Sequence, residues 1–321
     1  MITNDKVTEV FWIIDEFDKN LNVELSKNKF LSSSVLKFLL NSSIIQKFSV
    51  ILSSVIIADF VCILLIYNTI RVQQYLQITK FNDEFYPELA NKIMTIQEVI
   101  EARHSVRAYK EKPLTEDVVK VLKEKIAVLN REGNLHIQLI LNEPKAFQGT
   151  MAKYGKFRNA NNYIVMAGKK ADDLDERVGY FGEHLVLLAQ TLGLNTCWVG
   201  LSYSKVPGTY VLDEGEKITC YIAIGYGETQ GVGHKIKTVE QVSNASDTTP
   251  SWFKKGVEAA LLAPTAVNQQ KFSFEYIGME NNRHKIHAKR GFSIIGYTKM
   301  DLGIAKYHFE IGAGKENFVW V

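Results

Sequence analysis

Residues 102–109 read ARHSVRAY and gather two arginines, a histidine and a serine at one point of the chain. From Ser105 onward polar and apolar residues alternate as in an extended segment, so Ser105 and Arg107 are expected to project to the same side. An arginine fork and a serine hydroxyl on one side can hydrogen-bond a phosphate or a polarised heterocycle. A solvated basic end of a helix is the alternative interpretation.

The segment before this stretch, TIQEVIEA at residues 95–102, has the pattern of a short helix. Thr95 followed three residues later by Glu98 is a capping box, and apolar residues follow at helical spacing. A helix is therefore predicted to begin near Thr95 and to end near Arg103.

Glycine and proline divide the 321 residues into two unlike parts. All 21 glycines lie at or after Gly133, and residues 1–86 contain neither glycine nor proline. We predict a helical N-terminal extension of residues 1–93 and a second domain of residues 94–321, which uses both residues at turns. With 46% apolar residues, 23% charged residues and a net charge of +3, the composition is globular and does not indicate nucleic-acid binding.

Residues 48–67, FSVILSSVIIADFVCILLIY, form the main apolar run of the extension. The run is long enough to cross a bilayer and carries one charge, Asp59, so a transmembrane helix is one interpretation and a buried helix is the other. The expected location is cytoplasmic, with tethering to a membrane through this run left open. Residues 1–28 faintly resemble the start of insertion-sequence transposases, which would make the region a fusion remnant.

The second part repeats a pattern. Residues 116–141 and 250–277 each read as helix, loop and strand, and each unit is followed by a glycine-containing amphipathic helix. This predicts related α/β half-repeats at about 95–230 and 250–321. The glycines that align between the repeats are Gly182 with Gly303 and Gly193 with Gly314.

Three further segments carry candidate ligand-binding groups. APTAVNQQ at residues 263–270 places amides and a hydroxyl in a loop, where they can bind a planar polar ligand or hydrogen-bond within a turn. LGLNTCWVGLS at residues 192–202 ends a helix and enters a glycine turn, where a ligand can approach the backbone. Residues 218–237 run from a buried strand through glycines to Lys235 and Lys237, which could meet a phosphate or form a solvated basic loop.

Several other chemistries find no support. The glycines after residue 224 lack the final spacing of GxGxxG, which argues against a Rossmann site, and no P-loop, GxSxG or HExxH is found. The three cysteines, Cys62, Cys197 and Cys220, form no CxxC pair, so neither a metal site nor a disulfide framework is expected.

Taken together, RHSVRAY, APTAVNQQ, LGLNTCWVG and IGYGE resemble the FMN-dependent nitroreductase family over residues 94–321. The resemblance implies an α+β nitroreductase-like fold, bound FMN, NAD(P)H as electron donor, and a nitroaromatic, a quinone or a similar molecule as acceptor. It implies flavin-centred chemistry without a metal or a side-chain nucleophile. Arg107 would stabilise the reduced flavin.

The resemblance also implies cofactor-binding residues. Backbone amides of Gly200 and Leu201 would lie by the redox-active nitrogen, and Lys235 and Lys237 would meet the phosphate. The arginine segment and the 263–270 loop would hold the ring and the ribityl chain through Arg103, His104, Ser105, Arg107, Pro264, Thr265, Asn268 and Gln270.

The order of the motifs departs from that of typical members. The Pro-Thr-Asn-Gln loop here follows the glycine helix instead of preceding it, which resembles the branch of single-chain, two-repeat nitroreductases that imitate a homodimer. One FMN per chain at the seam between the repeats is therefore expected, and a second chain is not required. The alternatives are a flavin-binding sensor or carrier without turnover, and a membrane- or DNA-associated adaptor that acts through the N-terminal region.

Overall fold

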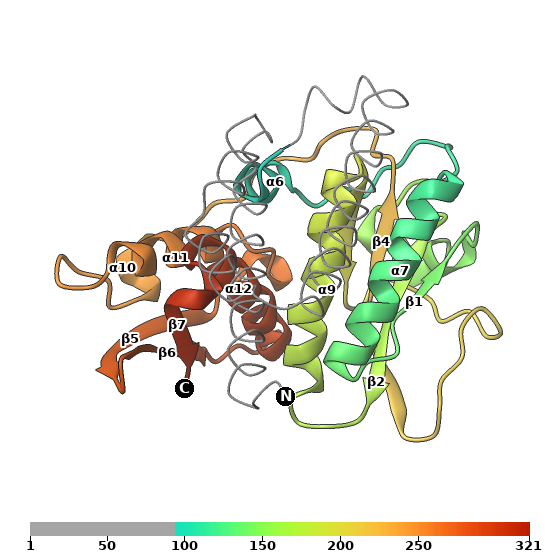
Figure 1. Cartoon of the computed structure of the whole chain (residues 1–321). Helices are drawn as coiled ribbons and strands as arrows, with labels where there is room; N and C mark the ends of the chain where they lie inside the picture. Colours follow the sequence, from blue (N-terminus) through green and yellow to red (C-terminus); the bar gives the residue numbers. More distant parts are fainter. Residues whose placement is uncertain (1–93) are drawn as a thin grey trace, which may run out of the picture. The chain divides into compact units, whose positions relative to one another are not determined.

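The computed structural model describes residues 94–321, which belong to one compact unit (Figure 1). The predictions for the N-terminal extension, including the apolar run 48–67, lie outside the described residues, and the boundary at residue 94 stays a prediction. Among the described residues, none of the helices combines the length and the apolar character needed to cross a membrane.

Helices and strands are interspersed along the chain, with short 3-10 helices between some of them. The helices are α6 (Ile96–Ala102), α7 (Glu116–Gly133), α8 (Thr150–Gly155), α9 (Leu174–Thr191), α10 (Val239–Val242), α11 (Ser251–Leu261) and α12 (Thr298–Ala313). The strands are β1 (Gln138–Ile140), β2 (Tyr163–Lys169), β3 (Asn195–Val199), β4 (Glu216–Gly225), β5 (Phe272–Glu280), β6 (Arg283–Arg290) and β7 (Phe318–Trp320). This mixture confirms the α+β prediction.

The predicted capping box starts α6. The Thr95 backbone N–H donates to Glu98 Oε2 at 2.7 Å, and the Glu98 backbone N–H donates to Thr95 Oγ1 at 3.3 Å. The helix ends at its C-cap, Arg103, and the chain becomes extended. Ser105 and Arg107 are exposed while Val106 between them is buried, so the predicted alternation is confirmed.

The first sheet has the order β1-β2-β4-β3, and all neighbouring strands are antiparallel. Its central strands are buried on both faces. Ile164 and Met166 of β2 face one apolar cluster together with side chains of α7 and α9, while Tyr163 and Val165 face another. β3 lies at the edge of this sheet, and the glycine turn that begins at Gly200 follows it directly.

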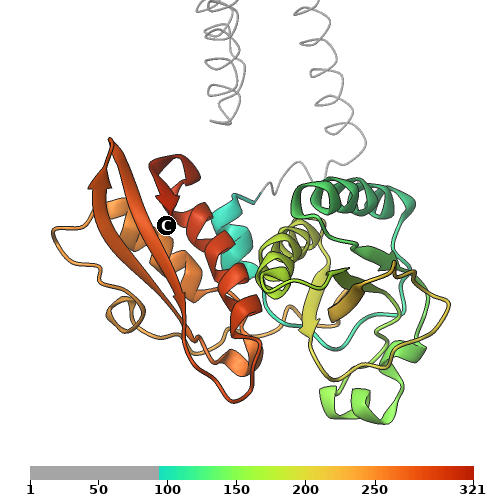
Figure 2. The ribbon, with the colours of Figure 1, turned by 90° about the horizontal axis from the view of Figure 1, so that it is seen from below.

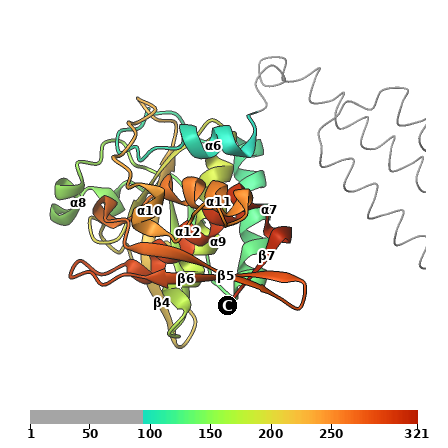
Figure 3. The same ribbon diagram turned by 90° about the vertical axis from the view of Figure 1, so that its left-hand side faces the viewer.

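The second sheet contains a long antiparallel β5–β6 pair, and β7 lies parallel to β6 (Figure 3). Both sheets use the same connections, since an antiparallel strand pair leads through one long helix to a further strand. In the first sheet β2 leads through α9 to β3, and in the second β6 leads through α12 to β7. β2 and β3 are parallel to each other because both are antiparallel to β4, which lies between them. In the second sheet no strand lies between β6 and β7, which pair directly and are also parallel.

Helices α9 and α12 pack against each other between the two sheets (Figure 2). A Cβ built on Gly179 would overlap the Met300 carbonyl oxygen, and a Cβ built on Gly303 would overlap the Glu176 carbonyl oxygen. The contact is reciprocal, because each glycine faces the residue three positions before the other glycine. The backbones therefore touch at this crossing, which only glycine permits.

The glycine alignment of the two repeats fits the structure in part. Gly193 and Gly314 both follow their helices with positive φ angles, 71° and 78°. The crossing, however, pairs Gly303 with Gly179, and Gly182 instead packs against the indole of Trp198. These contacts do not test the alignment of Gly182 with Gly303, which concerns equivalent sequence positions of the two repeats and stays a prediction.

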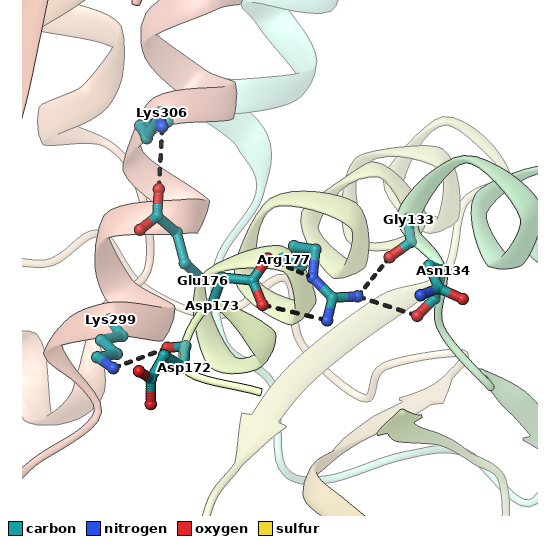
Figure 4. A network of polar contacts seen from close by, with 8 residues as sticks. All are labelled: Gly133, Asn134, Asp172, Asp173, Glu176, Arg177, Lys299 and Lys306. Atoms are coloured by element: carbon teal, nitrogen blue, oxygen red, sulfur yellow. Dashed lines mark hydrogen bonds and ion pairs between the residues drawn. The ribbon is translucent and has the colours of Figure 1, made fainter. Parts of the chain in front are cut away.

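Polar contacts join α7, α9 and α12 at one end of this crossing (Figure 4). Arg177 donates from Nη1 to the carbonyl oxygens of Gly133 and Asn134, at 2.6 and 2.9 Å, and so satisfies acceptors at the C-terminus of α7. On α12, Lys306 pairs with Glu176 at 2.9 Å, and Lys299 donates to the Asp172 carbonyl oxygen at 2.7 Å.

Candidate functional site

The arginine segment lies along the edge of the first sheet. Ser105 forms a parallel bridge with Thr196, and the Val106 backbone N–H donates to the Thr196 carbonyl oxygen at 3.0 Å. This pairing places ARHSVRAY beside the LGLNTCWVG turn, although the two are about ninety residues apart in the sequence.

The basic segment at 235–237 contacts the 263–270 loop. Asn268 Nδ2 and Gln270 Nε2 both donate to the Lys235 carbonyl oxygen, at 2.8 and 2.7 Å. The Lys237 backbone N–H donates to Gln270 Oε1 at 2.9 Å, and Lys237 Nζ donates to the Gln270 carbonyl oxygen at 2.6 Å. The two amides are thus used to hold the basic segment against the loop.

His104 connects the arginine segment to the same region. A Cβ on Gly231 would lie 2.7 Å from the His104 Cβ, and Gly231 has a φ of 76°. Burial and the neighbouring Arg103 guanidinium lower the pKa of His104, so that the neutral ring is favoured. All four predicted segments are therefore brought together in space.

A cavity of about 490 Å³ opens where these segments meet. Six of the predicted residues line it, namely Ser105, Arg107, Gly200, Leu201, Pro264 and Thr265. The other six lie outside its walls, namely Arg103, His104, Lys235, Lys237, Asn268 and Gln270. A volume of this size is typical of small-molecule and cofactor sites.

Much of the cavity wall could not be recognised from the sequence. These residues come from α8, from β3 and β4, and from the start of α12 with the loop before it. They include Tyr154, Lys156, Phe157, Trp198, Cys220, Ile295, Tyr297, Met300, Asp301 and Ile304. Apart from Trp198 and Cys220, which lie in two of the predicted segments, no motif marks them, because they meet only through the packing of the two sheets.

Tyr297 covers the glycine turn that the sequence predicts to be open to a ligand. A Cβ on Gly200 would lie 2.6 Å from Tyr297 Cζ and 2.7 Å from its hydroxyl oxygen. Tyr297 has a left-handed backbone, with a φ of 62°, directly before α12. Left-handed backbone is uncommon for a bulky residue and is often found at functional sites.

Behind the wall, Glu183 forms a buried polar network that fixes Trp198. The Trp198 indole Nε1–H donates to Glu183 Oε2 at 2.9 Å, and His308 Nε2 lies 2.9 Å from Glu183 Oε1. His308 Nδ1 faces the Ala259 carbonyl oxygen at 3.2 Å and must carry a proton there, because a carbonyl can only accept. Its other ring nitrogen faces the Glu183 carboxyl group, so both ring nitrogens of His308 have a polar partner in the buried network.

Arg103 belongs to this network and not to the cavity. Its guanidinium is buried, with Nε 4.0 Å from Glu183 Oε1 and Nη2 3.5 Å from the Leu262 carbonyl oxygen. Burial lowers the pKa of Arg103, and the Glu183 carboxylate opposes this shift. The position of Arg103 thus indicates a role in holding the wall rather than in touching a ligand.

Among the described residues that line the cavity, Asp301 is the one acidic side chain. Its Oδ1 accepts from the Ala266 backbone N–H at 2.9 Å, and its Oδ2 accepts from Gln269 Nε2 at 2.6 Å. Burial raises the pKa of Asp301 to about 6, although these two hydrogen bonds oppose the shift. The carboxyl group fixes the 264–270 loop to the first turn of α12.

This raised pKa predicts a dependence of stability on pH. The folded protein binds the Asp301 proton more tightly than the unfolded chain does, so this contribution is fully present below about pH 4 and is lost as the pH rises through about 6. Asp301→Asn should remove it. In urea unfolding between pH 4 and 7, the difference in unfolding free energy between wild type and variant should shift by about 2 to 3 kcal/mol. A constant difference would contradict the assignment.

Among the described residues, one cluster away from the cavity consists of side chains that can ligate a metal ion. Ligand atoms of His136, Asp213 and Glu216 lie within 4.8 Å of one another. His136 Nδ1 is hydrogen-bonded to Glu216 Oε2 at 2.7 Å, and the same oxygen accepts from the Asp213 backbone N–H at 2.8 Å. Glu216 is therefore already engaged by the other two residues, through the His136 ring and the Asp213 backbone.

Comparison with known proteins identifies the family. A family model described as "Putative TM nitroreductase" matches residues 95–313, which is well over half of the chain. No curated protein matches the chain.

Solved structures described as nitroreductases are similar to this chain at low identity. A "putative nitroreductase" from Thermotoga maritima MSB8 is 23% identical, with a TM-score of 0.49 over 70% of this chain and 86% of that one. A "putative nitroreductase in complex with FMN" from Desulfovibrio desulfuricans is 15% identical, with a TM-score of 0.39 over 50% of this chain and 100% of that one. The family model carries the assignment, and the chain belongs to this nitroreductase family, which is a family of oxidoreductases.

Proposed function

We propose that the protein is an FMN-dependent oxidoreductase that passes electrons from NAD(P)H to a nitroaromatic, a quinone or a similar acceptor in the cytoplasm. The observation that carries the proposal is the convergence of four segments, distant in sequence, around one cavity within a chain of the nitroreductase family. A sensor or carrier would bind FMN without turnover.

The cavity suits a flat ligand that carries negative charge. Its walls include aromatic rings of Phe157, Trp198 and Tyr297, and its exposed cationic side chains are Arg107 and Lys156. Among the described residues, neither cation is hydrogen-bonded or ion-paired to a protein group through its side chain. Both are therefore free to meet an anionic or electron-rich ligand.

FMN, when bound, would supply the electron-transfer chemistry, and the protein would supply binding, orientation and electrostatics. Arg107 would place a fixed positive charge where the reduced cofactor gains negative charge, which favours reduction. Trp198, held by Glu183, would keep one wall rigid. The Asp301 carboxyl would hold the 264–270 loop against α12.

The site is proposed to lie at the seam of two half-repeats that imitate a dimer. In support, the cavity takes Ser105, Arg107 and Gly200 from the first half and Thr265, Tyr297 and Asp301 from the second. The matching order of strands and long helices in the two halves is consistent with a repeat.

The proposal is tested by titrating the purified full-length chain with FMN and by following NAD(P)H oxidation with an added quinone. We expect one FMN per chain and turnover that depends on FMN. Binding without turnover would favour the sensor or carrier, and a folded chain that takes up no FMN would exclude both. Two tightly bound FMN molecules per chain would contradict a single site at the seam between the half-repeats.

Arg107→Ala should weaken FMN binding by about 1.5 to 3 kcal/mol, or roughly 10- to 150-fold, because a charge-assisted hydrogen bond is lost. Turnover should slow as well. Fluorescence titration with FMN measures the affinity. Arg158→Ala is a matched control, since Arg158 is exposed, pairs with Glu228 and lies outside the cavity wall. Equal affinities for wild type and Arg107→Ala would remove Arg107 from the site.

A further inference from the structure

The mouth of the cavity is rimmed by exposed apolar side chains. Four residues from separate segments both line the cavity and are more than half exposed, namely Tyr154, Leu201, Val267 and Ile295. Single exposed apolar residues are ordinary on a protein surface, but their concentration around one opening is characteristic of a binding surface.

The apolar surface continues along the loop between β6 and α12, residues 291–297. Phe292 and Ile294 are 85% and 94% exposed, next to Ile295. The loop is fixed at both ends, because the Gly291 backbone N–H donates to the Lys271 carbonyl oxygen at 2.7 Å and Gln269 Nε2 donates to the Gly296 carbonyl oxygen at 2.9 Å. Its apolar side chains are thus presented to solvent by an anchored backbone.

Charge divides the site into an inner and an outer region. Within the wall, Arg107 is assigned to FMN and Lys156 favours the electron-rich oxygens of a second ligand, while Asp301 is buried and engaged in two hydrogen bonds. The outer loop offers Phe292, Ile294 and Ile295. A ligand that fits both regions has a flat, oxygen-bearing head and an apolar chain that leaves through the mouth.

We propose that the acceptor is a quinone with an apolar side chain, whose head enters the cavity and whose chain lies on the 291–297 loop. This rests on the proposed function. The quinone takes up two electrons and two protons to become a quinol. NAD(P)H supplies a hydride, which carries both electrons and one of the protons, and water supplies the second proton.

The test compares two acceptors that share one ring, dimethoxy-methyl-benzoquinone without a side chain and the same ring with a decyl chain. Full-length protein loaded with FMN is assayed with NAD(P)H without detergent. We expect the decyl compound to have a kcat/KM at least about tenfold higher, since burying even a few methylene groups has this effect.

Substitutions in the 291–297 loop test whether the decyl chain binds there. Phe292→Ser and Ile294→Ser should each reduce the advantage of the decyl compound several-fold and leave the rate with the chainless compound unchanged. Met279→Ser is the matched control, because Met279 is 61% exposed on the neighbouring hairpin and lies outside the cavity wall. Both loop side chains are so exposed that their loss should not impair folding.

The outcomes separate this inference from the function on which it rests. Failure to reduce either quinone would overturn the proposed function. Equal kcat/KM for both quinones would overturn the proposed binding site for the apolar side chain of the quinone, but not the proposed function. Sedimentation at rising protein concentration completes the test, because self-association that Phe292→Ser and Ile294→Ser abolish would assign the loop to a second copy of the chain and not to a substrate.

Discussion

Glu183→Ala is expected to lower the free energy of unfolding by about 3 to 5 kcal/mol, because it removes one partner from a buried ion pair. Glu183 is fully buried. Its Oε2 accepts from the Trp198 indole N–H, and its Oε1 is hydrogen-bonded to His308 Nε2. Without it the guanidinium of Arg103 would remain buried without a counter-charge, and His308 Nε2 and the Trp198 indole N–H would lose their partner. Urea unfolding followed by tryptophan fluorescence measures the loss.

Glu176→Ala on the same helix is the matched control. Glu176 pairs with Lys306 at a similar distance, 2.9 Å, but both side chains are partly exposed. Solvent weakens such a pair to about 0 to 1 kcal/mol. A Glu183 variant no less stable than the Glu176 variant would show that the buried network contributes little. Trp198 should also lose its fixed orientation, so its fluorescence should change in the folded Glu183 variant but not in the control.

Gly303→Ala should destabilise the protein by about 2 to 3 kcal/mol, although alanine is the better helix former by about 1 kcal/mol. The new methyl group would overlap the Glu176 carbonyl oxygen, which is backbone and cannot move aside as a flexible side chain does. The two central helices would have to separate. Thermal and urea unfolding measure the effect.

Gly233→Ala provides the control for this substitution. Its Cβ would lie 3.7 Å from the nearest atom, His104 Cε1, which is an ordinary contact, so stability should change by less than about 0.5 kcal/mol. Gly179→Ala should match Gly303→Ala, because its methyl group would meet the Met300 carbonyl oxygen. The double variant should cost less than the sum, since one separation of the helices accommodates both methyl groups. Fully additive losses would argue against a shared crossing.

Local patterns of the sequence predicted local structure well. The capping box at Thr95 and the alternation after Ser105 are both found, because each depends on residues that are close in sequence. The helix–loop–strand readings of residues 116–141 and 250–277 correspond to α7 with β1 and α11 with β5. Periodicity determines such elements before tertiary packing contributes.

The candidate site was predicted less completely, because its side chains are selected by packing. Gln270 was expected to bind a ligand, but its amide is buried in hydrogen bonds to the basic segment. Arg103 was likewise expected to bind the flavin, but its guanidinium faces Glu183, a residue of α9 that no motif marks. Trp198 lies within a recognised motif, yet its place in the cavity wall depends on contacts made far along the chain.

Both halves of the chain contribute to the cavity wall, and this affects how the site responds when the protein is diluted. In an assembly of separate subunits, a site between them opens as the protein concentration falls below the dissociation constant. Here residues 105–220 and 264–304 are joined by one backbone, so each half meets the other at an effective concentration fixed by the connecting chain. We therefore expect closure of this cavity to be an intramolecular event. Its occupancy at low protein abundance would then depend on the free ligand concentration relative to the dissociation constant of the ligand.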